Sequence, residues 1–98
     1  MNRQGDLLIV KVKKIPKDVV KQNNRVLAEG EVTGHFHELD AGEVYESDGV
    51  LYFRVDGDKP ANLNHPEHKA IVFEPGDYKV IRQREYVPKS KGWRHVAD

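Results

Sequence analysis

The stretch EVYESDGVLYFRVD, residues 43–56, carries the clearest fold signal in the sequence. Asp48 and Gly49 stand between two runs rich in β-branched and aromatic residues. An Asp-Gly pair supplies the two positive φ angles of a type I′ turn, which joins antiparallel strands as a tight hairpin. The sequence therefore predicts a β-hairpin centred on this pair.

A two-residue loop also fixes which residues of the hairpin face one another. The expected cross-strand pairs are Ser47 with Val50, Tyr45 with Tyr52, Val44 with Phe53, and Glu43 with Arg54. They include an aromatic pair and a pair of opposite charges, and both kinds stabilise antiparallel strands. The predicted register therefore agrees with the chemistry of the side chains.

Period-two patterns continue outward from the hairpin, and long helical patterns are missing from the sequence. Residues 6–13 begin as an apolar block and end in alternation, which predicts a strand that is buried at its start. Residues 25–37 predict one long strand or two, with a bulge or bend at Gly30. Residues 61–65 alternate and predict a further strand.

A second hairpin is predicted over residues 69–86, with Pro75 and Gly76 at the centre of a type II turn. Residues 15–24 leave room for a short helical turn at most. Seven or eight short strands at this spacing predict an all-β fold, a small antiparallel barrel or sandwich. An α+β fold is the alternative if residues 16–23 or 88–96 are helical.

The 98 residues suffice for one domain, so residues 1–98 are expected to form a single β domain. The tail from 88 to 98 is polar and is expected to be loosely docked or disordered. Charged residues make up 33% of the chain, yet the net charge is zero, which argues against a general nucleic-acid coat.

The zero net charge hides an asymmetry along the sequence. Residues 1–27 carry a net charge of +5, residues 28–58 carry −8 and residues 59–98 carry +3. Two interpretations remain open: mutual neutralisation on the surface, or a dipolar binding face.

Cysteine is absent from the chain, so a disulfide-linked partner is excluded and a reducing compartment fits the composition. The apolar run near the N-terminus is too short for a signal peptide, and nothing approaches the length of a membrane span. We therefore expect a soluble cytoplasmic protein without a membrane partner.

Four of the five histidines fall in two short stretches, GHFH at 34–37 and HPEH at 65–68. On a strand, His35 and His37 leave the same face about 6.5–7 Å apart along the chain. His65 ends a predicted strand, and Pro66 turns the chain so that His68 is able to approach His65. These four residues are candidate ligands of one divalent metal ion, with zinc as the first choice.

Additional ligands of that metal site are carboxylates near the histidines, namely Glu38, Glu43 and Glu67. The competing interpretation is that the histidines cap strand ends and bond to backbone or water. A histidine pair could also serve as general acid and base in metal-free hydrolysis, but no nucleophile elbow or phosphate-binding glycine loop accompanies it. The sequence assigns no catalytic residue.

Two segments resemble the cupin family. GHFHELDAGE (34–43) is similar to the first cupin motif, an H-x-H followed by a Glu, and FEPGDYKV (73–80) is similar to the P-x-G turn of the second. The resemblance implies a metal-binding barrel. However, no histidine follows Pro75 and Gly76 at the ligand position, so it implies at most a degenerate site.

A second resemblance covers nearly the whole chain. It rests on RQGDLLIVKV, LAEGEVTGHFH, HPEHKAIVFEPGDYKVIRQREYVP and the terminal RHVAD, and above all on the EGEVTGHxH and RQREYxP blocks. These are similar to a group of small bacterial and phage-encoded proteins whose function is not known. The resemblance implies one module and no activity.

Basic and aromatic residues alternate between positions 78 and 95. The candidate partner-binding residues are Tyr78, Arg82, Arg84, Tyr86, Trp93 and Arg94. Arginines between aromatic rings can hold phosphates while the rings stack on unpaired bases. The alternative is that Arg82 and Arg84 pair with the acidic middle of the chain. We therefore expect a binding module for protein or RNA rather than an enzyme. The alternative function is a divalent-metal site, either non-catalytic or hydrolytic.

Overall fold

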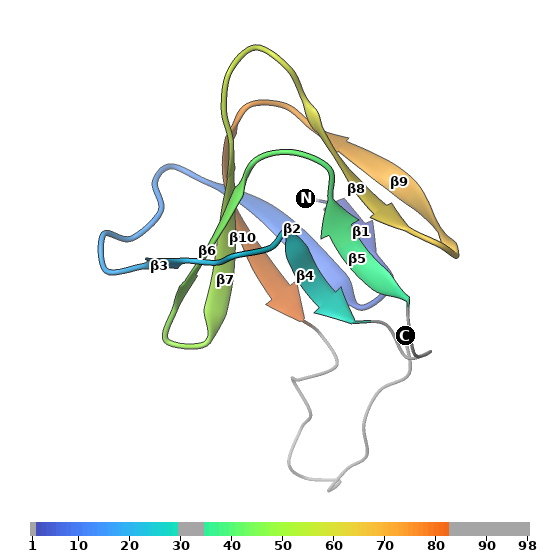
Figure 1. The fold of residues 1–98 in the computed structure, drawn as a ribbon, viewed down its shortest axis with the longest axis horizontal. Coiled ribbons are helices and arrows are strands. Elements are labelled where there is room, and N and C mark those ends of the chain that lie inside the picture. Colours follow the sequence, from blue (N-terminus) through green and yellow to red (C-terminus); the bar gives the residue numbers. More distant parts are fainter. Residues whose placement is uncertain (1, 30–34, 83–98) are drawn as a thin grey trace, which may run out of the picture.

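The computed structural model describes residues 2–29 and 35–82 (Figure 1). Ten strands form in this part of the chain, and no helix does. In chain order they are β1 Asn2–Gln4, β2 Leu7–Val12, β3 Val20–Lys21, β4 Val26–Glu29, β5 Phe36–Leu39, β6 Glu43–Ser47, β7 Val50–Val55, β8 Ala61–His65, β9 His68–Phe73 and β10 Gly76–Arg82. The predicted all-β class is confirmed.

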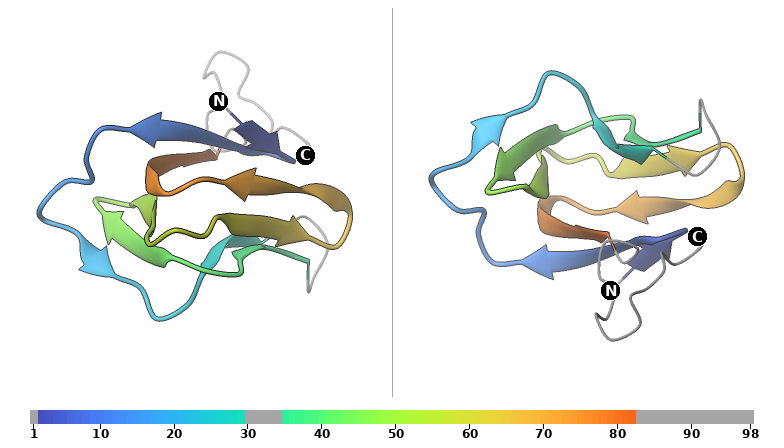
Figure 2. Two further views of the ribbon diagram at one scale, coloured as in Figure 1. Left: turned by 90° about the horizontal axis from the view of Figure 1, so that it is seen from above. Right: turned by 90° about the horizontal axis from the view of Figure 1, so that it is seen from below.

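The strands form two antiparallel sheets. One has six strands in the order β1-β2-β10-β7-β6-β3, and the other has four in the order β4-β5-β8-β9. The chain passes between the sheets four times, from β3 to β4, β5 to β6, β7 to β8 and β9 to β10, and Figure 2 shows these crossings as continuous bends. The two sheets share one core, so the architecture is sandwich-like rather than a closed barrel.

The Asp-Gly hairpin forms as the sequence predicts. Asp48 and Gly49 have φ angles of 51° and 79°, the left-handed values that a type I′ turn requires. Strands β6 and β7 pair in the expected register: Tyr45 lies opposite Tyr52, and Glu43 lies opposite Arg54. Because the Asp-Gly turn determines this register locally, it could be predicted without knowledge of the rest of the fold.

The second predicted hairpin, around Pro75 and Gly76, is wrong. β9 pairs with β8, whereas β10 pairs with β2 and β7 in the other sheet. Phe73 and Tyr78 on either side of the bend both point into the core, and the Tyr78 hydroxyl donates to the Glu74 carbonyl at 2.7 Å. The bend therefore carries the chain across the core, so that each strand buries its apolar face against the opposite sheet.

Residues 15–24 stay within the expected limit of one short helical turn: they contain no helix, and Val20 and Lys21 form β3, which pairs with β6 at the sheet edge. The expected number of strands needs correction. The seven or eight expected strands are ten, because the short polar strands β1 and β3 carry no periodic signal. The segment 25–37 holds two strands, with a bulge between Val26 and Ala28. Gly30 and the tail from 88 to 98 lie outside the described residues.

The core takes side chains from both sheets. Three aromatic rings lie at its centre, with centroids 5.3 Å apart for Phe53 and Phe73, 4.9 Å for Phe53 and Tyr78, and 5.0 Å for Phe73 and Tyr78. Burying each such ring stabilises the fold by roughly 1.5–3 kcal/mol. The aliphatic residues around them are Leu7, Ile9, Leu27, Ala28, Leu39, Val44, Val55, Ala61, Leu63 and Val80. Among the few buried polar side chains is His37, which is fully inaccessible.

Candidate histidine site

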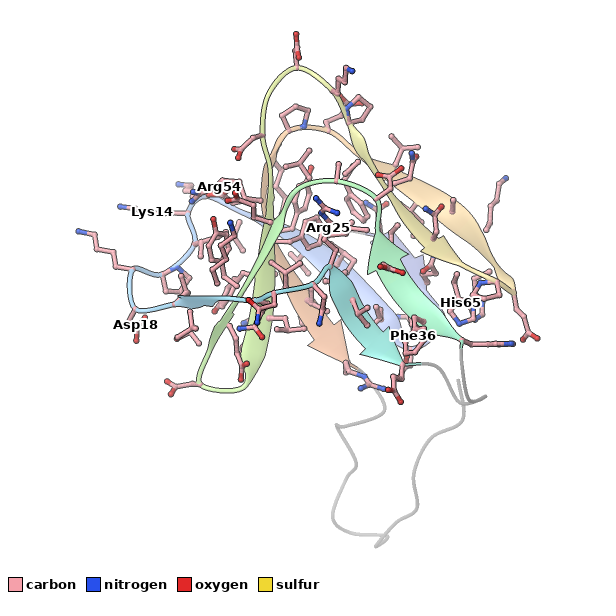
Figure 3. The ribbon with its side chains drawn as sticks, viewed as in Figure 1. Lys14, Asp18, Arg25, Phe36, Arg54 and His65 are labelled. Atoms are coloured by element: carbon pink, nitrogen blue, oxygen red, sulfur yellow. The ribbon has the colours of Figure 1, made fainter. Side chains whose placement is uncertain are left out.

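The four predicted histidines come together at one end of the four-stranded sheet. His37 lies in β5, His35 immediately precedes that strand, His65 ends β8 and His68 begins β9. His65 and His68 face each other across the β8–β9 turn. Figure 3 labels His65 next to this turn, with Phe36 of β5 nearby.

The imidazole rings of these residues contact one another. The ring centroids are 4.3 Å apart for His37 and His65, 4.5 Å for His65 and His68, 5.7 Å for His35 and His65, and 5.9 Å for His37 and His68. We refer to His35, His37, His65 and His68 as the histidine cluster. It contains one fully buried ring, two half-buried rings and the exposed His68.

A glutamine on β1 holds the buried ring. Nδ1 of His37 lies 2.8 Å from Oε1 of Gln4, and Nε2 of Gln4 donates to the carbonyls of Leu63 and Lys69, each at 2.9 Å. An amide oxygen only accepts hydrogen bonds, so Nδ1 of His37 must carry the proton. The network therefore leaves Nε2 of His37 with its lone pair.

That lone pair has no hydrogen-bond partner among the described residues, although Nε2 is buried. Burial, together with the neighbouring His65, lowers the pKa of His37 from 6.5 to about 4. The imidazole is therefore neutral near pH 7. A buried acceptor without a partner is uncommon in native proteins and indicates a place for a ligand, an ion or a water molecule.

The residue that packs against this nitrogen from the neighbouring turn is a glycine. Gly5, in the turn between β1 and β2, has a φ of 60°. A Cβ atom there would lie 3.1 Å from Nε2 of His68, 3.1 Å from Cε1 of His37 and 3.5 Å from Nε2 of His37. The Nε2 atoms of His37 and His68 thus both approach Gly5 on the side where other residues carry a side chain. We call the region between Gly5 and these two nitrogens the Gly5 space.

The other two rings are oriented differently. Nδ1 of His65 accepts a hydrogen bond from the backbone N–H of Glu67 at 3.0 Å, so Nε2 carries the proton when this ring is neutral. Nδ1 of His35 lies 3.8 Å from a carboxylate oxygen of Glu67. Glu67 therefore contacts both half-buried rings of the cluster.

The remaining predicted ligands lie elsewhere. Glu38 follows His37 in β5 and is on the opposite, exposed face of that strand. Glu43 lies in the other sheet, where it bonds to Lys21 and Tyr45, so the structure does not bring these two carboxylates together with the histidine rings. Among residues 2–29 and 35–82, no group of three His, Asp or Glu side chains is arranged to hold a metal ion.

An ion pair between a buried aspartate and a half-buried arginine borders the site. Oδ2 of Asp6, next to Gly5, lies 3.4 Å from a guanidinium nitrogen of Arg82, which also donates to the Glu29 carbonyl. Asp6 raises the pKa of His37 and Arg82 lowers it, and both effects are smaller than that of burial. The pair therefore adds little net charge beside the histidine.

The basic and aromatic face expected for a protein or RNA partner is not exposed at its two described positions. Tyr78 is buried in the core, and burial raises the pKa of its hydroxyl. Arg82 points to the same side and pairs with Asp6, outside the acidic 28–58 segment. The other four candidates, Arg84, Tyr86, Trp93 and Arg94, lie outside the described residues.

Sequence reasoning identified the histidines but missed Gln4 and Gly5. The H-x-H spacing and the Pro66 turn signalled the four rings, although β5 begins only at Phe36, after His35. Gln4 belongs to a three-residue polar strand and lies 33 positions from His37. The sequence motifs described above do not indicate the contact between Gln4 and His37.

The fold and the site define a two-sheet antiparallel β domain with a histidine cluster held from β1. The chain belongs to a protein family described as a domain of unknown function (DUF8820), which matches residues 3–83. That range includes Gln4, Gly5 and the whole histidine cluster. No curated protein and no solved structure matches the chain. Membership of a family of unknown function agrees with the broader resemblance, while the particular shared blocks and the cupin similarity gain no support.

Proposed function

We propose that the histidine cluster binds a divalent transition-metal ion, with zinc as the first choice. Nε2 of His37 and Nε2 of His68 are the first two ligands. One observation carries the proposal: a buried imidazole nitrogen without a partner in the described part of the chain and a second imidazole nitrogen both lie within 3.5 Å of the Cβ position at Gly5.

The chemistry of these two groups suits a transition metal. Zinc binds histidine nitrogen at about 2.0–2.1 Å, and imidazole ligands favour zinc, copper and nickel over magnesium or calcium. A ligand must be deprotonated to bind, and the low pKa of His37 satisfies that condition near neutral pH. The hydrogen bond from Nδ1 to Gln4 is also the arrangement found behind most metal-bound histidines.

The proposed site combines a fixed ligand with a movable one. His37 is held in the core by Gln4, whereas His68 is exposed beside the β8–β9 turn. Rotation of the His68 side chain brings its nitrogen toward an ion in the Gly5 space. Water, His35 or Glu67 then completes the coordination. Because the ligands are not prearranged as a set of three, we expect weaker binding than at a structural zinc site.

The competing occupant is a water molecule that donates a hydrogen bond to Nε2 of His37. Buried waters commonly satisfy such groups, and they need two to four polar partners. A water molecule and a metal ion in this place depend differently on Nε2 of His68. A water can be held by other polar groups when His68 is replaced, whereas the metal loses one of two imidazole ligands.

Calorimetric titration of chelator-treated full-length protein with zinc tests the proposal. We expect one zinc per chain, and an affinity that falls roughly tenfold or more in His68→Gln, because an imidazole ligand is lost. Glu38→Gln removes a carboxylate from the opposite, exposed face of β5 and serves as the control, which should bind as the wild type does. An absence of binding by the wild type, or an equal loss in Glu38→Gln, would overturn the proposal.

Three further expectations from the sequence remain predictions: a protein or RNA partner, hydrolytic chemistry and a cytoplasmic location. A protein or RNA partner has support only from the sequence pattern around Arg84 and Tyr86. Hydrolytic chemistry at the cluster lacks an assigned nucleophile. A cytoplasmic location rests on the cysteine-free composition.

A further inference from the structure

We infer that Gln4 is the positioning residue of the histidine site: it fixes the tautomer of His37 so that Nε2 is the nitrogen offered to a ligand. The inference rests on the proposed function for its consequence, metal affinity. The tautomer itself can be measured without any metal.

The orientation of the Gln4 amide follows from its surroundings. Two backbone carbonyls, of Leu63 and Lys69, lie 2.9 Å from one end of this amide. Both are acceptors, so that end must be the NH₂ group, since an oxygen placed there would face two other oxygens. The amide oxygen is therefore directed at His37, 2.8 Å from Nδ1.

The fixed oxygen determines the tautomer of His37. With the proton on Nδ1, the ring donates to Gln4 and Nε2 keeps a lone pair. With the proton on Nε2, two lone pairs would face each other between Nδ1 and Oε1. In addition, a buried N–H would lack a partner among the described residues, which typically costs about 1–3 kcal/mol. The first tautomer is therefore strongly favoured.

The position of Gln4 in the fold keeps its amide oxygen fixed beside Nδ1 of His37. The side chain is 3% exposed and belongs to β1, at the edge of the six-stranded sheet. Its three hydrogen bonds reach β5, β8 and β9 of the other sheet. Rotation of the amide would break all three bonds, so the acceptor stays in place while His68 moves.

Nitrogen-15 NMR of the histidine rings in chelator-treated protein tests the inference. In the wild type, His37 is expected to carry its proton on Nδ1. Gln4→Met has a similar length but neither donor nor acceptor at its end, so we expect a mixture of tautomers and a roughly tenfold or greater loss of zinc affinity.

The outcomes separate this inference from the proposed function. A wild-type His37 protonated on Nε2, or a Gln4→Met variant with an unchanged tautomer, would overturn the positioning role. If Gln4→Met does not fold, the wild-type spectrum still decides, because it reports which ring nitrogen of His37 carries the proton. A correct tautomer without zinc binding would leave the role of Gln4 intact and would remove the metal proposal alone.

Discussion

The side-chain oxygen of Gln4 lies 2.8 Å from Nδ1 of His37, although the two residues are 33 positions apart in sequence. The contact runs from β1 of the six-stranded sheet to β5 of the four-stranded sheet. One hydrogen bond therefore helps to join the two sheets and also orients the buried imidazole. Any change that loosens β1 should disturb the histidine site as well as the fold.

Replacing Gly5 with alanine should weaken metal binding, because the new side chain would press against the rings of both His37 and His68. The new Cβ would lie 3.1 Å from the rings of both His37 and His68. Gly57→Ala is the matched control, because its φ of 79° is also left-handed while its Cβ would contact nothing within 4 Å. Both variants should lose roughly 1–2 kcal/mol of stability from the strained backbone.

Only Gly5→Ala should lose zinc affinity, by roughly tenfold or more, because a displaced imidazole no longer reaches the ion. Calorimetry measures the affinity, and urea denaturation measures the free energy of unfolding. Equal zinc affinities in the two variants would show that the Gly5 space is not the metal site.

The stability of the metal-free protein should fall when the pH is lowered from 6.5 to about 4. In the folded state burial lowers the pKa of His37 from 6.5 to about 4, so between these values the unfolded chain binds a proton that the native state does not. The free energy of unfolding therefore decreases on acidification, and His37 accounts for up to about 3 kcal/mol of that decrease. The decrease due to His37 reaches its full size below the folded-state pKa.

Urea denaturation in the presence of chelator, repeated across that pH range, measures the effect. His37→Gln should flatten the dependence, because the replaced side chain does not titrate. An unchanged slope in this variant would assign the pH dependence to other groups.

Removal of one core ring should be far more damaging than removal of its exposed neighbour. Phe73 is 1% exposed and contacts Phe53 and Tyr78, whereas Val72 in the same strand is 54% exposed. We expect Phe73→Ala to lose about 3–5 kcal/mol of stability, and Val72→Ala to lose less than about 0.5 kcal/mol. Urea denaturation measures both, and similar losses would contradict the described core.

The fold could be predicted where the signal was local. Asp48 and Gly49 determine their own backbone angles, and a two-residue turn then sets the register of β6 and β7. Pro75 and Gly76 also mark a reversal, but a reversal does not say whether the flanking strands pair or enter opposite sheets. That choice depends on where Phe73 and Tyr78 find apolar partners, which is a property of the whole core.

The site could be predicted only in part, for a similar reason. The spacing of His35 and His37 and the turn at Pro66 are short-range features, and they pointed to the four rings that come together. Gln4 reaches His37 only because β1 lies beside the end of the other sheet. A contact between a three-residue strand and a distant β5 leaves no periodic pattern in the sequence.

The most direct measurement is a zinc anomalous-difference map from crystals of the wild-type protein grown with zinc after chelator treatment. We expect one peak in the Gly5 space, at about 2.0–2.1 Å from Nε2 of both His37 and His68. A map without a peak there, or with zinc only on exposed histidines while an ordered water bonds to Nε2 of His37, would contradict the proposed metal site.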